Sequence, residues 1–180
     1  MFGIFPDGSA VDEAAHRVPP TTRQLFSITA SHTFDPAVFS FLTLTAGFRN
    51  TPGADYQQRY LTAVADNAIG NFMTSAMAPA LLHQDPRYVA SGRDGILRRA
   101  GYALSRTVVT RSSSGRTKLN YSEIGGNAVA AGLSNLYYSP DDRTLSGTLT
   151  RWGSQILWNC VSNEMKEFWP DVRRRLTHRQ

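Results

Sequence analysis

The sequence predicts an all-α protein: a single compact bundle of about six helices with an irregular N-terminal arm. The length of 180 residues suits one domain. Apolar residues recur with the period of an α-helix over residues 56–76 and again over 145–168. Helix-capping residues precede several apolar segments of the chain. We therefore expect an arm over residues 1–20 and a helical domain over residues 21–180.

The beginning of the domain carries start signals for two helices. Thr21 or Thr22 can cap a short helix that runs to about Ser31. Asp35 is followed by Pro36, and a capping residue before a proline at the first helical position is a typical helix start. This second helix is apolar on nearly all sides, so we expect it to be central or partly lipid-facing.

A long third helix is predicted from Asp55, because apolar side chains recur about every four residues from Tyr56 to Ala76. Pro79 is expected to end or kink this helix, since proline lacks a backbone N–H group and crowds the preceding turn. Residues 83–95 are then predicted to form an irregular connection.

The middle of the chain allows two interpretations. A fourth helix is predicted over residues 96–108, followed by a polar loop over residues 111–118. Alternatively, residues 102–110 and 117–123 form a β-hairpin, because residues 108–110 favour strands. The sequence leaves both open.

A fifth helix, rich in small residues, is predicted to start at Asn120 and to run to about Tyr137. Asn120 is an N-cap with a glutamate three residues later, which is the spacing of a capping box. Small residues allow another helix to approach closely. Three of them are the predicted helix-packing positions: Gly125, Ala128 and Gly132. They could pack inside the monomer or support self-association between copies.

A sixth helix is predicted to start at Ser139, which precedes a proline and two aspartates. Its apolar residues continue through the segment 145–168, and Pro170 is expected to interrupt it before a short terminal turn. Glu164 and Glu167 lie one turn apart near a lysine and are predicted to lie on a solvated face.

The formal net charge of +5 comes almost entirely from one region. Residues 87–118 carry eight Lys and Arg against one Asp, a net charge of +7. A basic amphipathic helix commonly contacts an anionic surface, so this region predicts binding to lipid headgroups or, less favoured without a recognisable reading motif, to nucleic acid. A solvated face balanced by the acidic N-terminal region is the alternative. The candidate anion-binding residues are Arg98, Arg99, Tyr102, Arg106, Arg111 and Arg116.

One polar cluster is a candidate for catalysis. His83 and Asp85 could form a general-base pair, with Arg87 holding an oxyanion, as in a hydrolase. Asp85 could instead pair with an arginine locally and order the turn. No motif for a metal or cofactor accompanies the cluster, so neither is expected. A single cysteine, Cys160, excludes an internal disulfide framework and is predicted to be a core thiol.

Five short segments together resemble a set of uncharacterised bacterial proteins that often carry a secretion leader. These segments are His83-Gln84-Asp85-Pro86-Arg87-Tyr88, Arg99-Ala100-Gly101-Tyr102-Ala103-Leu104-Ser105-Arg106, Asn120-Tyr121-Ser122-Glu123, Ser134-Asn135-Leu136-Tyr137-Tyr138 and Glu167-Phe168-Trp169-Pro170-Asp171. The resemblance covers about residues 20–176 and supplies no catalytic residue. It implies a periplasmic or envelope location if a leader is missing here, and the cytoplasm otherwise.

We therefore expect a non-enzymatic, envelope-associated helical protein that contacts an anionic surface through its basic region. A hydrolase and a non-specific nucleic-acid binder are the alternatives.

Overall fold

The computed structural model describes residues 18–48, 55–92 and 94–177, and it confirms the predicted fold class. The protein is 75% helical, with six helical rods and one small three-stranded sheet. Three consecutive helical segments, α3, η2 and α4, make up one of these rods. The elements are α1 (Thr22–Thr33), α2 (Pro36–Phe48), α3 (Tyr56–Phe72), the π-helical η2 (Met73–Met77), α4 (Ala78–Leu82), β1 (Gln84–Asp85), α5 (Ile96–Val108), β2 (Val109–Ser112), β3 (Thr117–Leu119), α6 (Tyr121–Ser134), the 3₁₀ turn η3 (Pro140–Asp142) and α7 (Leu145–Thr177).

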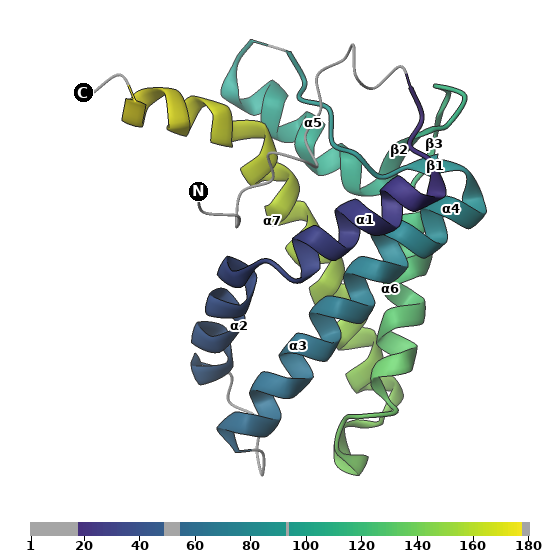
Figure 1. Ribbon diagram of the computed structural model, residues 1–180, viewed down its shortest axis with the longest axis vertical. Helices are drawn as coiled ribbons and strands as arrows, with labels where there is room; N and C mark the ends of the chain where they lie inside the picture. Colours follow the sequence, from purple (N-terminus) through teal and green to yellow (C-terminus); the bar gives the residue numbers. More distant parts are fainter. Residues whose placement is uncertain (1–17, 49–54, 93, 178–180) are drawn as a thin grey trace.

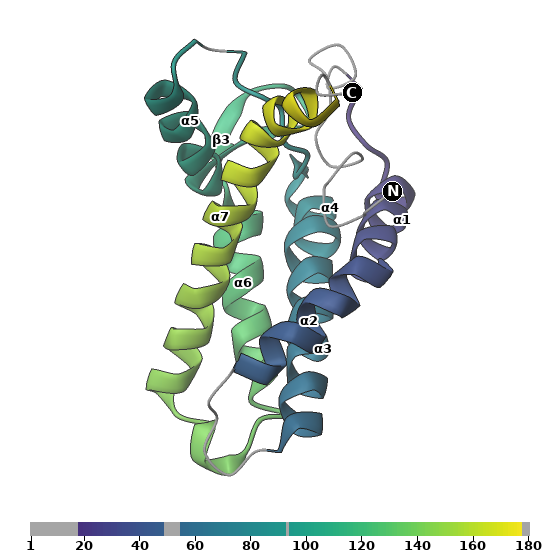
Figure 2. The same cartoon turned by 90° about the vertical axis from the view of Figure 1, so that its left-hand side faces the viewer.

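The long rods form the body of the bundle, and the three strands lie together at one end (Figure 1). The rod of α3, η2 and α4 packs against α6, and α6 packs against α7. Figure 2 shows these rods running along the long axis of the molecule. The helix α5 packs on the C-terminal half of the bundle, above α6 and against α7, next to the sheet.

Three of the predicted helix starts are confirmed by their hydrogen bonds. Thr21 forms a complete capping box with Gln24 at the start of α1. The Asp55 side chain accepts from the Gln58 backbone N–H at 2.7 Å. Asn120 caps α6 by accepting from the Glu123 backbone N–H at 3.1 Å.

Pro79 does not end the third helix. The backbone widens into the π-helical turn η2 and continues as α4, in whose first turn Pro79 lies. A proline is tolerated there because the first turn of a helix needs no N–H donor from it. The rod ends only at His83, whose backbone is left-handed with a φ of 53°.

Both interpretations of the middle of the chain are partly right. Residues 96–108 form the predicted helix, and the predicted loop over 111–118 is mostly a hairpin, in which β2 and β3 pair antiparallel with Val109 opposite Leu119. The strand β1 adds to the other edge of β2, with Asp85 opposite Arg111. Two-residue strands such as β1 carry too little pattern to be predicted.

The sixth predicted helix differs at both ends. Residues 140–142 form a separate 3₁₀ turn, and α7 begins at Leu145. Pro170 lies inside α7, which runs on to Thr177 instead of being interrupted. Figure 1 shows α7 turning aside in its last turns, as a helix does where a proline removes one hydrogen bond.

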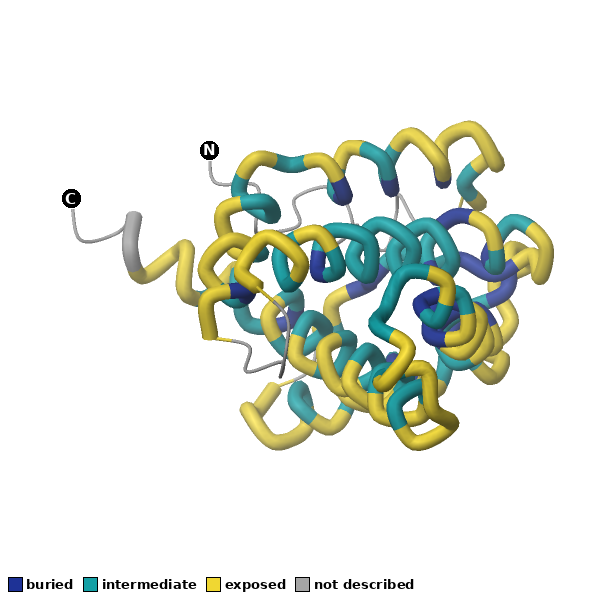
Figure 3. The backbone as a smooth tube through the Cα atoms, turned by 90° about the horizontal axis from the view of Figure 1, so that it is seen from below, coloured by how far each residue is buried: buried dark blue, intermediate teal, exposed yellow. Residues whose placement is uncertain are grey.

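Buried positions are scattered along the described chain (Figure 3). They are mostly small or polar residues, and many large apolar side chains are exposed. The buried apolar residues are mostly alanines: Ala46, Ala63, Ala76, Ala103, Ala130 and Ala131. The helix α2 is not central, because only Ala46 of it is buried while Phe48 is 81% exposed. None of the described helices combines the length and the hydropathy needed to cross a membrane.

Candidate functional site

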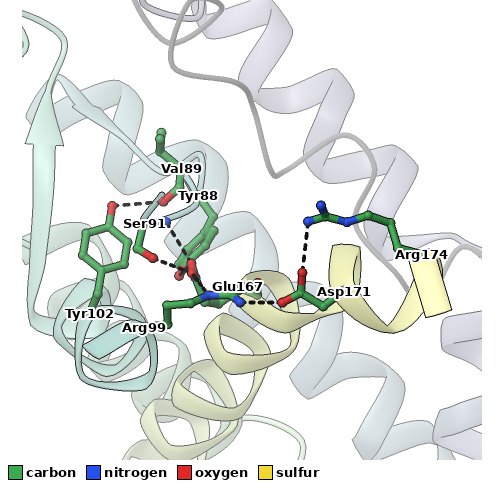
Figure 4. Close-up of polar contacts among 8 residues, drawn as sticks. All are labelled: Tyr88, Val89, Ser91, Arg99, Tyr102, Glu167, Asp171 and Arg174. Atoms are coloured by element: carbon green, nitrogen blue, oxygen red, sulfur yellow. Dashed lines mark hydrogen bonds and ion pairs between the residues drawn. The ribbon is translucent and has the colours of Figure 1, made fainter. Parts of the chain in front are cut away.

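The helix α5 turns its charged side into the protein, toward α7 (Figure 4). The Arg99 guanidinium donates from Nε to the Glu167 carboxylate at 2.9 Å and from another nitrogen to Asp171. It also lies over the Phe168 ring, 4.6 Å from the centroid. Arg99 is therefore held by α7 and is not available to an external anion.

Glu167 is the centre of this arrangement and is only 1% exposed. Its carboxylate accepts from the Tyr88 hydroxyl at 2.8 Å and from the Ser91 backbone N–H and hydroxyl at 3.0 and 2.6 Å. Burial disfavours the charged carboxylate, but the hydrogen bonds from Ser91, Arg99 and Tyr88 outweigh it, so the pKa of Glu167 lies below its ordinary value. Glu167 was predicted to lie on a solvated face, and this is wrong.

The contacts of Glu167 and Arg99 also shift the pKa values of the neighbouring groups. The hydrogen bonds that Arg99 donates to Glu167 and Asp171 raise its pKa above the ordinary value. Its hydrogen bond to Asp171 lowers the pKa of that carboxylate. Asp171 also accepts from Arg174 at 3.0 Å. Burial, followed by the hydrogen bond to Glu167, raises the pKa of Tyr88 far above the usual range, so its hydroxyl stays protonated.

Tyr102 and Arg106 also lie on the inner side of α5. The Tyr102 hydroxyl donates to the Val89 carbonyl at 3.0 Å, and its ring meets the Tyr88 ring edge-on at 6.3 Å. The Arg106 guanidinium lies 5.8 Å from the Tyr102 ring centroid. Burial lowers the pKa of Arg106. The predicted anion-binding face of Arg99, Tyr102 and Arg106 is therefore an internal packing surface.

The remaining candidate anion-binding residues lie nearer to solvent. Arg98 and Arg116 are exposed, and Arg111 is half-buried in β2. Lys118 on β3 is also exposed and adds a basic group to the same hairpin. Half of the predicted set is thus accessible in part or in full.

The outer side of α5 is apolar. Leu97 is 88% exposed, Ile96 is 74% exposed, and Leu104 and Val108 are each 48% exposed. Leu119 of the adjoining hairpin is 50% exposed. The apolar side of a surface helix usually faces the core, and in α5 Leu97 and Leu104 point away from it. We call the outward residues Ile96, Leu97, Arg98, Leu104, Val108, Arg116, Lys118 and Leu119 the α5 face.

The proposed general-base pair is not formed. The His83 side chain is exposed, while Asp85 is buried and accepts two hydrogen bonds from the Arg87 Nε at 3.0 and 3.1 Å. Arg87 also donates to the Val18 carbonyl at 2.7 Å, so the Asp85–Arg87 pair fastens the residues before α1 to the sheet. This is the local ordering role that was the alternative for Asp85.

The small-residue helix α6 packs through a different side from the one predicted. Gly125, Ala128 and Gly132 are exposed. The close approach is at Gly126, where an added Cβ would lie 3.1 Å from the Met73 backbone carbon and oxygen. The predicted packing positions are therefore wrong for the monomer.

A second polar layer lies between α6 and α7. The Glu123 carboxylate accepts from Asn127 at 2.9 Å and from Asn159. Burial raises the pKa of Glu123 and lowers that of Lys166, which faces it. Cys160 nearby is half-buried, with its sulfur 3.4 Å from the Thr107 hydroxyl. These contacts favour a packing role over chemistry.

Sequence reasoning missed Glu167, Asp171 and Tyr88 because their partners are distant in the chain. One signal could have found them. The segments that carry the resemblance, such as Glu167-Phe168-Trp169-Pro170-Asp171, are the ones that supply these buried polar contacts.

The described residues contain no cluster of three His, Cys, Asp or Glu that could hold a metal ion. A hollow of about 460 Å³ lies at the other end of the bundle, along α3, and is lined by residues such as Asp55, Leu61 and Tyr137. None of the predicted site residues lines it.

No family model, curated protein or solved structure matches this chain. Its function is therefore inferred from the arrangement of its own residues.

Proposed function

We propose that this chain is a non-enzymatic protein of the bacterial envelope that docks on an anionic lipid surface through the α5 face. The observation that carries the proposal is the reversed orientation of α5, which presents Leu97 and Leu104 to the outside. An amphipathic helix with an outward apolar side and flanking basic residues is the usual element of a protein that lies on a membrane surface.

The apolar part of the α5 face gains free energy from leaving water. Leu97 and Ile96 are 88% and 74% exposed, so nearly all of each side chain is available for burial. Burying one such side chain contributes roughly 1.5–3 kcal/mol. Several of them along one helix favour reversible insertion at the level of the headgroups.

The basic part supplies selectivity for negative charge. Arg98 is exposed near the start of α5, and Arg116 and Lys118 are exposed in the hairpin that follows its end. Asp94 is the acidic residue of the segment 94–119, and it is exposed. Each basic residue near an anionic leaflet adds roughly 1 kcal/mol of binding free energy. Arg99 adds nothing to this attraction because it is paired with Glu167 and Asp171.

The alternatives are less well supported. A hydrolase based on His83 and Asp85 has no geometric support, because Arg87 occupies the Asp85 carboxylate. Nucleic-acid binding makes use of the three exposed basic residues but leaves exposed leucines in contact with phosphate or water. An envelope location rests on the resemblance of the sequence motifs.

Co-sedimentation of the full chain with lipid vesicles tests the proposal. The wild type is expected to bind vesicles that contain phosphatidylglycerol and to bind weakly to neutral phosphatidylcholine vesicles. Leu97→Ser with Leu104→Ser should abolish binding, and Arg98→Glu with Arg116→Glu should remove the preference for anionic lipid. The matched control is Leu61→Ser on α3, where the side chain is 56% exposed on another face.

Two results would contradict the proposal. One is a wild type that stays in the supernatant with anionic vesicles. The other is a leucine double variant that binds as the wild type does. A shift of DNA or RNA at low salt that disappears with Arg98→Glu and Arg116→Glu, without vesicle binding, would favour the nucleic-acid alternative.

A further inference from the structure

The guanidinium groups of Arg106 and Arg111 have no hydrogen-bond or ion-pair partner among the described residues. Arg106 lies in the last turn of α5, and Arg111 lies in β2, which follows α5 directly. Both residues are half-buried. Half-buried charges are normally paired, so packing alone does not explain two unpaired arginines.

The two arginines border the same region of the molecule. Arg111 lies opposite Asp85 in the sheet. Burial lowers the pKa of Arg106, and Tyr102 raises it. The charge of Arg111 also lowers it, whereas that of Asp85 raises it. Charges shift a pKa mainly when they are close, so Arg106 and Arg111 lie near each other, where the end of α5 meets β1 and β2.

The carboxylates around this region are already held by other arginines. Asp85 accepts from the Arg87 Nε at 3.0 and 3.1 Å and from a terminal nitrogen of Arg87 at 2.7 Å. Glu167 and Asp171 form ion pairs with Arg99. The two unpartnered arginines therefore contribute two positive charges that no described carboxylate balances.

Both guanidinium groups can be reached from solvent. In the described part of the chain, the side-chain nitrogen and oxygen atoms that are shut off from solvent and unpartnered belong to Arg151, Gln155 and Glu164. The nitrogens of Arg106 and Arg111 are not among them, so water or a dissolved anion has access to these donors.

From these contacts we infer that Arg106 and Arg111 form a binding site for one dianionic phosphate group, as a phosphate monoester carries it. A phosphate monoester has a charge of about −1.5 to −2 at pH 7, which matches the two unbalanced arginines. A carboxylate or a phosphodiester has one negative charge and would leave one arginine unbalanced. The planar fork of a guanidinium also fits phosphate oxygens with two parallel hydrogen bonds.

The surroundings of the two arginines suit a bound phosphate. The Tyr102 ring, 5.8 Å from the Arg106 guanidinium, favours a fixed position of that group. Thr117 is paired with Arg111 across the hairpin, so both side chains lie on the same face of the sheet. Thr117 is exposed, and its hydroxyl is a further donor for a phosphate oxygen.

The phosphate group could belong to a dissolved molecule or to a lipid headgroup. Leu119 of the α5 face lies two residues from Thr117 on the same strand and therefore on the same side of the sheet. The site thus borders the surface that we propose to contact lipid. It uses different arginines from that surface, so it does not depend on lipid docking.

Isothermal titration calorimetry of the full chain with glycerol 3-phosphate tests the inference. The wild type is expected to bind one equivalent. Arg106→Gln and Arg111→Gln should each raise the dissociation constant about 10-fold or more, because each removes charged hydrogen bonds. Dimethyl phosphate, with its single charge, should bind the wild type about 10-fold more weakly or worse. The matched control is Arg23→Gln, an exposed arginine of α1, which should leave the dissociation constant within about twofold.

Thermal unfolding followed by circular dichroism checks that each variant still folds. Neither guanidinium has a carboxylate partner to lose, so both glutamine variants should melt close to the wild type in the absence of ligand. Glycerol 3-phosphate should raise the melting temperature of the wild type more than that of either variant. The comparison with dimethyl phosphate uses the wild type alone, so it holds even if one variant fails to fold.

Lipid vesicles distinguish the two sources of the phosphate group. Phosphatidic acid carries a phosphate monoester, whereas phosphatidylglycerol carries a phosphodiester. If the phosphate belongs to a lipid, the wild type should prefer phosphatidic acid vesicles, and Arg106→Gln should lose that preference. If it belongs to a dissolved molecule, the wild type should bind glycerol 3-phosphate without such a preference.

Two results would overturn the inference. One is a wild type that neither binds glycerol 3-phosphate up to about 5 mM nor prefers phosphatidic acid. The other is binding that both glutamine variants retain. Leu97→Ser with Leu104→Ser should abolish vesicle docking but leave the affinity for glycerol 3-phosphate unchanged, so failure of the lipid proposal and failure of the phosphate site are distinguishable.

Discussion

The inner and outer sides of α5 differ in a way that reverses the usual pattern of a surface helix. The inner side carries Arg99 and Arg106, and α7 supplies buried or half-buried carboxylates to Arg99. The outer side carries Leu97 and Leu104, which touch mainly solvent. A charged stripe and an apolar stripe therefore do not by themselves determine which side of a helix is buried. The side that is buried depends on whether the neighbouring elements supply partners for the charged side chains.

The adjacent residues Arg98 and Arg99 differ in exposure and in ion pairing. Arg98 is exposed, whereas Arg99 is 20% exposed and holds two carboxylates of α7. A count of basic residues along the sequence does not distinguish the two. Only one of them can contribute to binding an external anion.

The largest effect is expected from Glu167→Ala. Removing a buried carboxylate leaves Arg99, Tyr88 and Ser91 without their acceptor, and breaking a buried pair costs about 3–5 kcal/mol. The free energy of unfolding, measured with urea, should fall by that amount. Asp141→Ala, at an exposed position, is the control and should change it by less than about 0.5 kcal/mol. A loss below about 1 kcal/mol for Glu167→Ala would mean that the inner side of α5 does not depend on this carboxylate.

The two adjacent arginines should separate stability from binding. Arg99→Ala removes charged hydrogen bonds to Glu167 and Asp171 and is expected to lower the free energy of unfolding by about 2–3 kcal/mol. Arg98→Ala should leave stability within about 0.5 kcal/mol and weaken binding to anionic vesicles about fivefold, which corresponds to roughly 1 kcal/mol. Urea unfolding and vesicle co-sedimentation measure both quantities on the same samples. Equal effects of the two variants in either assay would remove the distinction between the two sides.

Gly125 and Gly126 allow the same comparison on α6. An added Cβ at Gly126 would meet the Met73 backbone at 3.1 Å, so Gly126→Ala is expected to destabilise the fold by about 1–3 kcal/mol. Gly125→Ala meets nothing within 4 Å and should stabilise α6 by up to about 1 kcal/mol, since alanine is the better helix former. Melting temperatures by circular dichroism should therefore move in opposite directions. A shared direction would contradict the assignment of the inner side of α6.

The smallest effect concerns pH. A carboxylate with a pKa below its value of 4.5 in the unfolded chain binds fewer protons when folded. The stability that Glu167 contributes is therefore fully present above about pH 4.5 and is lost as the pH falls through its lowered pKa. We expect wild-type stability to fall more steeply on acidification than that of Glu167→Gln, measured by urea unfolding at several pH values. Parallel curves would show that the pKa of Glu167 is the same in the folded and the unfolded chain.

The sequence was sufficient for the fold class and for most of the helix starts, because both depend on local chemistry. Thr21, Asp55 and Asn120 cap helices through bonds to residues three positions away. The continuation of the rod past Pro79 was not predicted, since it requires a π-helical turn that no residue pattern marks. The strand β1 was missed because it exists only through its pairing with β2.

The site was harder to predict than the fold. Glu167 lies 68 residues from Arg99 and 79 from Tyr88, and nothing local distinguishes it from the neighbouring Glu164. The side of α5 that faces α7 depends on the pairing of Arg99 with Glu167. Because Glu167 was expected to be solvated, Arg99 was expected to be available to an external anion. His83, Asp85 and Arg87 were chosen for their reactive groups, but the structure uses Asp85 and Arg87 to pair with each other.

The orientation of α5 is the claim on which the lipid proposal depends, and cysteine accessibility tests it most directly. In a Cys160→Ser background, single cysteines at Leu97, Leu104, Ala103 and Thr107 would be labelled with a maleimide under native conditions. The structure predicts rapid labelling at positions 97 and 104, which are 88% and 48% exposed, and protection at 103 and 107, which are 0% and 2% exposed. Protection at 97 and 104 with rapid labelling at 103 and 107 would show that the apolar stripe faces the core after all.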